Sequence, residues 1–315
     1  MQDLVTIGET MVAFIPNEQG YIRYCSSFGK KTAGAESNVA IGMAKLGHTS
    51  GWVGKIGEDE FGEFILRELR GEGVDISHAV KTPGASTGLM FKQFDAQGQT
   101  SVFYYRKDSA GSSLCPDDID PHYIARAKIL HVSGITPALS DSCAETVAYA
   151  VHVARQAGCL VSFDPNIRLK LWSAQSAKAA LLPLLSQSDI VLLGADEGEL
   201  LLGTDQPREI IARLRTMGVG RIGLKLGAQG AQAADRTDTF LIPPVQVRVV
   251  DTVGAGDAFN AGFLAGVIEG RSVEVCGHMG ALMGAMAVSS YGDVEGLPNR
   301  KAFDGFAENT RIIYR

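Results

Sequence analysis

Four short apolar segments in the second half of the chain are separated by stretches with a helical pattern. The segments are KILHVSG, CLVSFDPN, DIVLLGA and RIGLKLG, and the helical stretches include residues 141–157 and 173–185. Strands that are buried on both faces and alternate with helices form a parallel sheet with helical crossovers. The pattern therefore predicts an α/β fold with a mostly parallel central sheet and helices on both faces.

The first half of the chain continues this alternation but contains two segments that depart from it. A strand is predicted from Val5 to Ile15, a helix within AESNVAIGMAKLGH, a strand at SGWVGKIG and a helix within DEFGEFILRELRGEG. The departing segments span roughly residues 9–32 and 84–110, and the second contains a predicted hairpin with its turn at Asp95 to Gly98. We expect them to pair as a small β-sheet lid, inserted in a single domain that spans residues 1–315.

Charge and hydropathy argue against several classes of partner. The formal net charge is −6, so binding to nucleic acid or to an anionic membrane would gain little from counterion release. No apolar run approaches the ~18 residues of a membrane span, and acidic Asp3 and Glu9 stand where a secretion signal would be basic. The 5 cysteines are scattered and have no metal-ligand spacing, as is typical of reduced thiols. We expect a cytoplasmic protein with no membrane or nucleic-acid partner.

Polar residues follow the ends of several predicted strands. Ligands of an open parallel sheet bind beyond the carboxyl ends of its strands, so these residues are expected to lie together. They are Gly34 to Asn38, Asp164 to Asn166 with Arg168, Glu197, Lys225 to Gly227, and Asp251 to Asp257. Carboxylates, cations and helix starts that contain glycine suit an anionic or phosphorylated ligand.

The segment DTVGAGDAFNAGF, Asp251 to Phe263, places small residues directly before an apolar helix. Consecutive backbone N–H groups from Gly254 to Asp257 can converge at the positive end of the helix dipole and hold a developing phosphoryl charge. Beside such an anion site, Asp257 is best explained as a base that accepts a proton from a hydroxyl. A buried helix with Asp257 as its N-cap explains the same residues, and local chemistry does not separate the two interpretations.

The segment GVGRIG, Gly218 to Gly223, matches the G-x-G-x-x-G pattern of dinucleotide-binding folds in the wrong context. That motif follows a strand and opens a helix, whereas this segment follows a helix that ends near Met217 and opens a strand. A dinucleotide-dependent oxidoreductase is therefore a weak alternative. The sequence also lacks G-x-x-x-x-G-K-[ST], so an ATP site would be of another kind.

DTVGAGDAFNAGFLAG resembles the C-terminal signature of the ribokinase-like, or pfkB-type, carbohydrate kinases. TAGAESNVAIGMAKLG and VGKIGEDEFGE resemble the N-terminal signature, in the right order and over nearly the whole chain. The resemblance implies a ribokinase-like fold with a β lid, transfer of the ATP γ-phosphoryl group to a sugar hydroxyl, and Mg²⁺ on the phosphates. It further implies that Asp257 is the catalytic base and that Gly254, Ala255 and Gly256 form the anion hole.

The resemblance also implies a nucleotide site. The family's Asn-x-x-Glu motif, which is linked to Mg²⁺ and phosphate, falls on Gly194 to Glu197, so Glu197 is retained and Gly194 replaces the Asn. Lys225, Gly227 and Gly230 lie where the family's adenosine-phosphate loop runs. Without the resemblance, Glu197 is equally well explained as a first-turn glutamate and Lys225 as a strand-end lysine in solvent.

Within the family, FYYRKDSAGS and DPNIRLKLW are most similar to the 2-keto-3-deoxygluconate kinases. The substrate contacts implied are Gly34, Asn38, Tyr104, Arg106 and Arg168, with Asp257 as the base. An arginine can hold the carboxylate of such a sugar acid through two parallel hydrogen bonds. The alternatives are a solvated charge for Arg106 and an ion pair with Asp164 for Arg168. Met90 stands where such relatives often carry a substrate-contacting tyrosine, which leaves open another sugar acid or a neutral ketose.

Several functions therefore remain open. The leading one is a kinase that converts 2-keto-3-deoxygluconate to its 6-phosphate, and the alternatives are a fructokinase or ribokinase type and a non-catalytic sensor of a sugar or nucleotide. Carbonyls around Asp251 could also hold a monovalent cation, and lid edges could pair two copies of the chain as a dimer. His131 and His278 lack nucleophile or metal spacing and are predicted to be structural.

Overall fold

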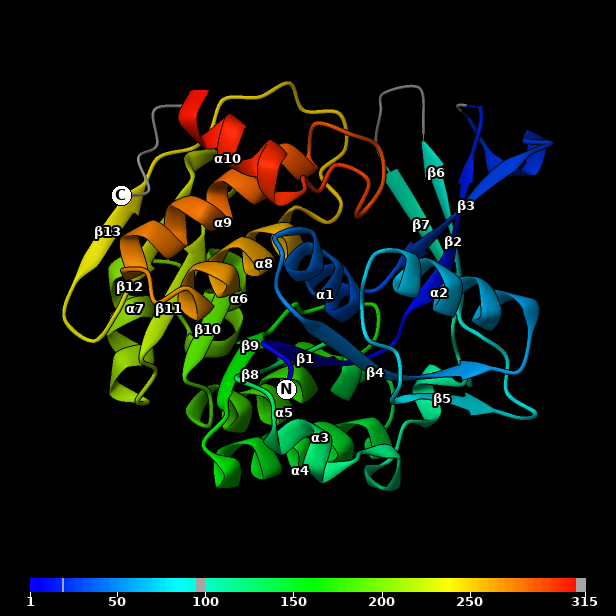
Figure 1. Ribbon diagram of the computed structural model, residues 1–315, viewed down its shortest axis with the longest axis horizontal. Coiled ribbons are helices and arrows are strands. Elements are labelled where there is room, and N and C mark those ends of the chain that lie inside the picture. Colours follow the sequence, from blue (N-terminus) through cyan, green and yellow to red (C-terminus); the bar gives the residue numbers. More distant parts are fainter. Residues whose placement is uncertain (19, 95–99, 310–315) are drawn as a thin grey trace.

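The computed structural model describes residues 1–18, 20–94 and 100–309, and it is built on a 9-stranded sheet (Figure 1). In spatial order its strands are β13 (Thr239–Ile242), β12 (Ala231–Ala234), β11 (Arg221–Lys225), β10 (Ile190–Gly194), β9 (Leu160–Asp164), β8 (Ile129–Ser133), β1 (Leu4–Ile7), β4 (Ser50–Gly57) and β5 (Ala79–Thr82). The strands from β11 to β5 in this order are parallel, whereas β12 and β13 are antiparallel additions at one edge. The predicted α/β class is confirmed.

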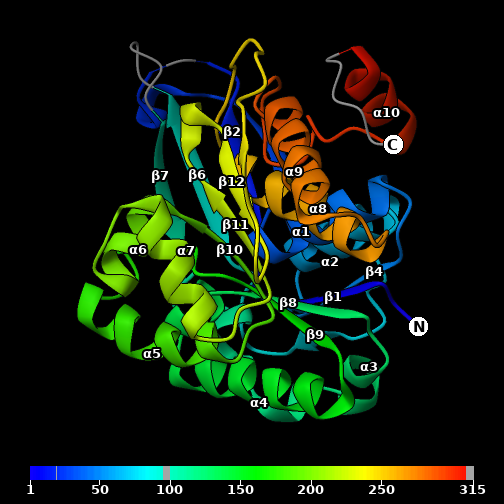
Figure 2. The ribbon, with the colours of Figure 1, turned by 90° about the vertical axis from the view of Figure 1, so that its left-hand side faces the viewer.

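Helices cover both faces of this sheet (Figure 2). One face carries α1 (Ala35–Lys45), α2 (Glu60–Gly71), α8 (Ala255–Ile268), α9 (Val273–Ala287) and α10 (Arg300–Asn309). The other carries α3 (Pro121–Ala125), α4 (Asp141–Ala157), α5 (Ala174–Ser186), α6 (Ala195–Leu202) and α7 (Pro207–Thr216). Short 3₁₀ turns lie at Ile22–Tyr24, Gly111–Ser113, Pro116–Asp118, Thr136–Ala138 and Gly227–Gln229.

Local sequence signals explain where these helices begin and end. The Asp59 side chain accepts hydrogen bonds from the N–H groups of Phe61 and Gly62 and so caps α2. Ser140 caps α4, which ends at Gly158 in the left-handed conformation with φ 75°. Since α7 ends at Thr216 and β11 begins at Arg221, the segment GVGRIG opens a strand, as predicted.

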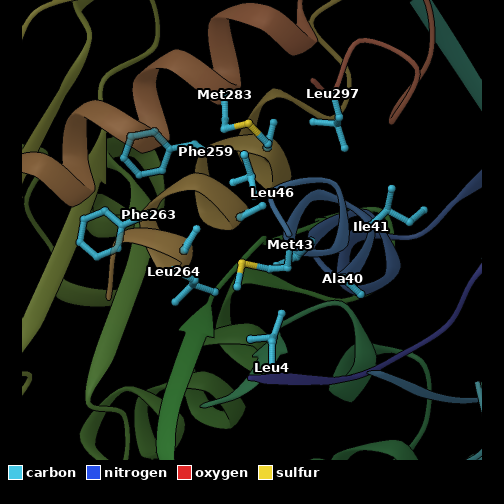
Figure 3. Close-up of a cluster of buried hydrophobic side chains, with 14 of the residues drawn as sticks. Leu4, Ala40, Ile41, Met43, Leu46, Phe259, Phe263, Leu264, Met283 and Leu297 are labelled. Carbon is cyan, nitrogen blue, oxygen red and sulfur yellow. The ribbon is translucent and has the colours of Figure 1, made fainter. Parts of the chain in front are cut away.

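Helix α8 is buried on nearly all sides between the sheet, α1 and α9. Figure 3 shows Phe259, Phe263 and Leu264 of α8 among side chains of α1 and α9. Small residues allow this close approach, since a Cβ at Gly262 would lie 2.4 Å from the carbonyl oxygen of Met279. The first turn of α8, which contains the predicted anion loop, is therefore held rigidly.

A second, 4-stranded sheet stands beside the main one, at the upper right of Figure 1. Its order is β3 (Phe28–Ala33), β2 (Met11–Pro16), β6 (Leu89–Phe94) and β7 (Thr100–Tyr105), and only the β2–β6 pair is parallel. Its strands come from the two segments predicted to form the lid. The predicted hairpin turn, Asp95 to Gly98, lies outside the described residues.

The single strand predicted from Val5 to Ile15 is wrong, because this segment is β1 and β2 in two different sheets. Apolar residues continue on both sides of the break, so the hydropathy pattern does not reveal it. The chain leaves the main sheet at Gly8, where a Cβ would lie 2.3 Å from the carboxyl carbon of buried Glu36. Strands β12 and β13 were not among the predicted elements, since each has only 4 residues.

Within the described ranges, no helix is long and apolar enough to cross a membrane. The 5 cysteines are free thiols, three of them buried.

Candidate active site

A cavity of about 800 Å³ lies between the carboxyl ends of the parallel strands and the small sheet. The predicted site residues that line it are Gly34, Asn38, Tyr104, Arg106, Arg168, Gly194, Glu197, Lys225, Gly254, Gly256 and Asp257. Residues far apart in the sequence are thus brought to one place, at the sheet edge where they were expected.

Three predicted site residues do not line this cavity in the described part of the chain: Ala255, Gly227 and Gly230. Ala255 is the first residue of α8 and lies between two glycines that do line it. Gly227 and Gly230 form the turn between β11 and β12, and a Cβ at Gly230 would lie 2.2 Å from the carbonyl oxygen of Ile242. The turn itself therefore needs this glycine, and contact of either residue with the nucleotide stays a prediction.

The N-cap of α8 is Gly254, and Asp257 is the third residue of the helix, so Asp257 does not cap it. Gly254 has φ 79°, and a Cβ there would lie 2.4 Å from the carbonyl oxygen of Asp293. Both the backbone conformation and the neighbouring backbone exclude a side chain at this position. The first turn of a helix leaves its N–H groups without intrahelical acceptors, and here that turn faces the cavity.

Asp257 is held by the buried side chain of Asn38, whose Nδ2 donates a 2.8 Å hydrogen bond to Asp257 Oδ2. Burial, together with the nearby carboxylates of Asp164 and Asp293, raises the pKa of Asp257 to about 7, although Asn38 and Lys225 act to lower it. A carboxylate with a pKa in this range can accept a proton near neutral pH. Asn38 Oδ1 is buried and has no hydrogen-bond partner among the described residues.

Asp164 is the centre of a buried polar network at the end of β9. Its Oδ2 accepts hydrogen bonds from Lys225 Nζ at 2.8 Å and from Asn260 Nδ2 at 2.6 Å. Burial alone would raise the pKa of Asp164, but Lys225 and Asn260 hold it below its usual value. The pKa of Lys225 is raised, because Asp164 and Glu197 outweigh the effect of desolvation. Lys225 is therefore a fixed cation in the cavity wall, and the solvent-lysine alternative is wrong.

Glu197 is held by two backbone N–H groups. Oε2 accepts from Gly194 N and Oε1 from Ile167 N, both at 2.8 Å. Burial and the charge of Asp164 raise the pKa of Glu197 to about 7. The side chain thus links the start of α6 to the loop after β9, which an ordinary first-turn glutamate would not do.

Arg106 is buried and pairs with Glu9, a residue that sequence reasoning missed as part of the site. Glu9 also accepts a hydrogen bond from Ser109 Oγ. Glycines enclose this carboxylate, since a Cβ at Gly88 or Gly111 would lie within 2.6 Å of Glu9 side-chain atoms. The solvated-charge alternative for Arg106 is therefore wrong.

Arg168 is exposed, lines the cavity, and has no ion-pair partner in the part of the chain that the structure describes. The alternative in which it pairs with Asp164 is wrong, because Lys225 occupies that carboxylate. Tyr104 is 40% exposed and lies beside Arg106, whose guanidinium carbon is 5.7 Å from the ring centroid. The free guanidinium and the tyrosine ring are thus both available to a ligand.

Sequence reasoning also missed the buried ion pair between Lys92 and Asp293. Lys92 after three apolar residues of the same strand was an available signal, but nothing local indicates a partner 201 residues away. His131 is structural, as predicted: its Nδ1 lies 3.0 Å from Ser162 Oγ, and burial lowers its pKa to about 4. No group of three or more His, Cys, Asp or Glu residues suited to hold a metal occurs among the described residues.

Comparison with known proteins gives a consistent result. The family model of the pfkB family carbohydrate kinases matches residues 1–300. The chain is 39% identical to the 2-dehydro-3-deoxygluconokinase of Bacillus subtilis over 316 aligned residues, 99% of this chain and 98% of that protein. It is 34% identical to fructokinase-1 of Zea mays, with coverages of 85% and 84%.

The solved structures agree on the fold. A candidate ribokinase II from E. coli, solved in complex with ATP and Mg²⁺, superposes with a TM-score of 0.92 at 26% identity. The alignment covers 98% of this chain and 100% of that chain. The predicted ribokinase-like architecture is confirmed, and neither the sensor nor the oxidoreductase alternative is supported. The chain belongs to the pfkB family of carbohydrate kinases and is an ATP-using sugar kinase that phosphorylates a sugar hydroxyl.

Proposed function

We propose that this kinase phosphorylates 2-keto-3-deoxygluconate on its 6-hydroxyl group. The observation that carries the proposal is Arg168, a guanidinium without a carboxylate partner among the described residues, in the same cavity as Asp257. An anionic substrate would supply the missing partner, whereas a neutral sugar would leave the cation unused. The similarity to the Bacillus subtilis 2-dehydro-3-deoxygluconokinase supports the same choice.

In the proposed reaction, Asp257 accepts the proton of the attacking hydroxyl. Asn38 orients the carboxylate through the 2.8 Å hydrogen bond, and the N–H groups of the first turn of α8 face the charge that develops on the transferred group. Lys225, fixed by Asp164, adds positive charge on the same side of the cavity. The protein therefore acts by orienting the reactants and stabilising charge.

The carboxylates that line the cavity fit Mg²⁺ bound together with ATP. Asp164 and Glu197 already accept hydrogen bonds from protein groups, so they suit an ion held mainly by phosphate oxygens and water. When bound, the ion would neutralise phosphate charge. We propose that Glu197 contacts it indirectly. A monovalent cation near the Asp251 carbonyls, a dimer formed through the small sheet and a cytoplasmic location stay predictions.

The pH dependence of turnover follows from the raised pKa of Asp257. Protonation of this base should lower kcat/KM as the pH falls below about 7, with a limiting slope of about tenfold per pH unit. Initial rates between pH 5.5 and 9, with ATP held saturating, measure this curve. A profile that stays flat down to pH 5.5 would contradict the assignment.

Arg168→Ala should reduce kcat/KM for 2-keto-3-deoxygluconate by about 10- to 100-fold, since a charge-assisted hydrogen bond contributes about 1.5–3 kcal/mol. The same variant should leave kcat/KM for fructose unchanged, because fructose has no carboxylate. Exposed Arg208 on α7 lies outside the cavity, so Arg208→Ala is the matched control. Equal losses on both sugars would argue against recognition of a carboxylate.

A fructokinase activity is the second candidate. Met90 lies in the cavity wall and has no hydroxyl group that could bind a sugar acid. Arg106 is already paired with Glu9, so its charge is not available to a substrate carboxylate. The similarity to the Zea mays fructokinase-1 covers 85% of the chain. Purified protein assayed with ATP, Mg²⁺ and a panel of sugars distinguishes the two candidates by their kcat/KM values.

A further inference from the structure

The small sheet is tied to the rest of the molecule by an ion pair that is buried at the cavity wall. Lys92 of β6 is 0% exposed, and its Nζ lies 2.7 Å from Asp293 Oδ1. Asp293 belongs to the segment between α9 and α10, and both residues line the cavity. Met90 and Val102, which lie beside Lys92 on the face of the sheet that lines the cavity, carry no charge, so Asp293 is the group that balances the charge of Lys92.

Asp293 also lies directly against the anion loop. Its backbone occupies the space that a side chain at Gly254 would need, with the carbonyl oxygen 2.4 Å from a Cβ placed there. The preceding residue, Gly292, donates through its N–H to Asp251 Oδ2 at 3.4 Å. A continuous set of contacts thus runs from β6 through Asp293 to the first turn of α8.

We propose that Lys92 and Asp293 are positioning residues for phosphoryl transfer, which fix the first turn of α8 relative to the small sheet that closes the sugar side of the cavity. A buried ion pair adds little net stability compared with apolar residues of the same size, but it allows few arrangements of the two groups. Here one partner is on the sheet and the other supports Gly254. The inference rests on the kinase activity of the family and on neither candidate sugar.

The direct test is to break the pair from each side with Lys92→Met and Asp293→Asn. Each variant should lower kcat by about 10- to 100-fold, the cost of misplacing reacting groups by about 1 Å, while KM for the sugar stays within about threefold. The assay uses 2-keto-3-deoxygluconate, or fructose if the panel identifies that sugar as the substrate. Failure to phosphorylate any sugar would contradict the proposed function, whereas an unchanged kcat in both variants would overturn this inference alone.

Lys31 provides the matched control. It lies on β3 of the same sheet and pairs with Glu295 of the same segment at 3.1 Å, but the two side chains are 28% and 36% exposed. An exposed ion pair is screened by solvent and contributes little, so Lys31→Met should change kcat by less than about threefold. A loss in Lys31→Met equal to that in Lys92→Met would show that general docking of the segment matters, and not the buried pair.

The pH dependence of kcat/KM provides a second test, because a purely structural role of the pair would not change it. The groups whose charges or hydrogen bonds act on Asp257 are Asn38, Asp164, Asp293 and Lys225, and the negative charge of Asp293 raises the pKa of Asp257. Asp293→Asn should therefore shift the acid limb of kcat/KM to lower pH, and Lys92→Met should not. If Lys92→Met folds poorly, the kcat of Asp293→Asn alone tests the proposal, because asparagine is the same size as aspartate. An increase in KM with unchanged kcat would instead identify Lys92 as a direct sugar ligand and overturn the proposal.

Discussion

Replacement of Asp257 by asparagine is expected to lower kcat by about 10²- to 10⁴-fold, the usual contribution of a general base. Asparagine keeps the shape of the side chain and can still accept the hydrogen bond from Asn38, but it cannot take the proton of the sugar hydroxyl. Steady-state kinetics with ATP and sugar at pH 8 measure the loss. Calorimetric affinity for ATP should stay within about twofold, because this carboxylate is assigned to the hydroxyl.

Stability separates this effect from misfolding. The raised pKa shows that the folded state disfavours the ionised carboxylate, so the stability that the protonated group contributes is lost as the pH rises through about 7. At pH 8 the neutral asparagine should therefore leave Tm unchanged or higher. Asp304→Asn, on an exposed side chain of α10, should change neither kcat nor Tm appreciably. Retention of most of the kcat in Asp257→Asn would rule out the base assignment.

Gly254→Ala is the second substitution with a large expected effect, a loss of about 10²-fold in kcat from displacement of the anion loop. The new Cβ would collide with the backbone of Asp293, which cannot move away as a flexible side chain could. Gly270→Ala is the control, because Gly270 also has positive φ, at 70°, but has open space around its Cβ position. In both variants the left-handed conformation should lower the free energy of unfolding by about 1–2 kcal/mol. Only Gly254→Ala should also lower kcat. Equal kcat values for the two would show that the loop tolerates displacement.

The large sheet could be predicted from the sequence because β8, β9 and β10 are mostly apolar and each is followed by a helix. The point at which the chain changes sheets could not, since the apolar residues before and after Gly8 look alike in either sheet. The edge strands β12 and β13 also escaped prediction, because a short strand at a sheet edge carries little hydropathy signal.

The candidate site divides in the same way. Asp257 and its glycines are contiguous in the sequence, and Asp164, Glu197 and Lys225 each stand at the end of a predicted strand or just beyond it. Their positions marked them as candidates, and the resemblance to the kinase family supplied the roles of Asp257, Glu197 and Lys225. The partners of these residues could not be predicted. The Glu9–Arg106, Lys92–Asp293 and Asp164–Lys225 pairs join residues that are far apart in sequence and meet only because the topology brings them together.

The parallel pairing of β2 with β6 has a consequence for how the molecule folds. The two strands cannot meet until the chain between them, which contains α1, β4, α2 and β5, has been gathered into the main body. Because the entropy of closing that long loop is lost before the strands gain contacts, we expect this sheet to form late. During synthesis, β2 and β3 emerge well before β6. Until β6 is available, the edge of β2 that pairs with β6 has no partner strand. The sugar side of the cavity would thus be completed only after the elements between β2 and β6 have begun to pack together.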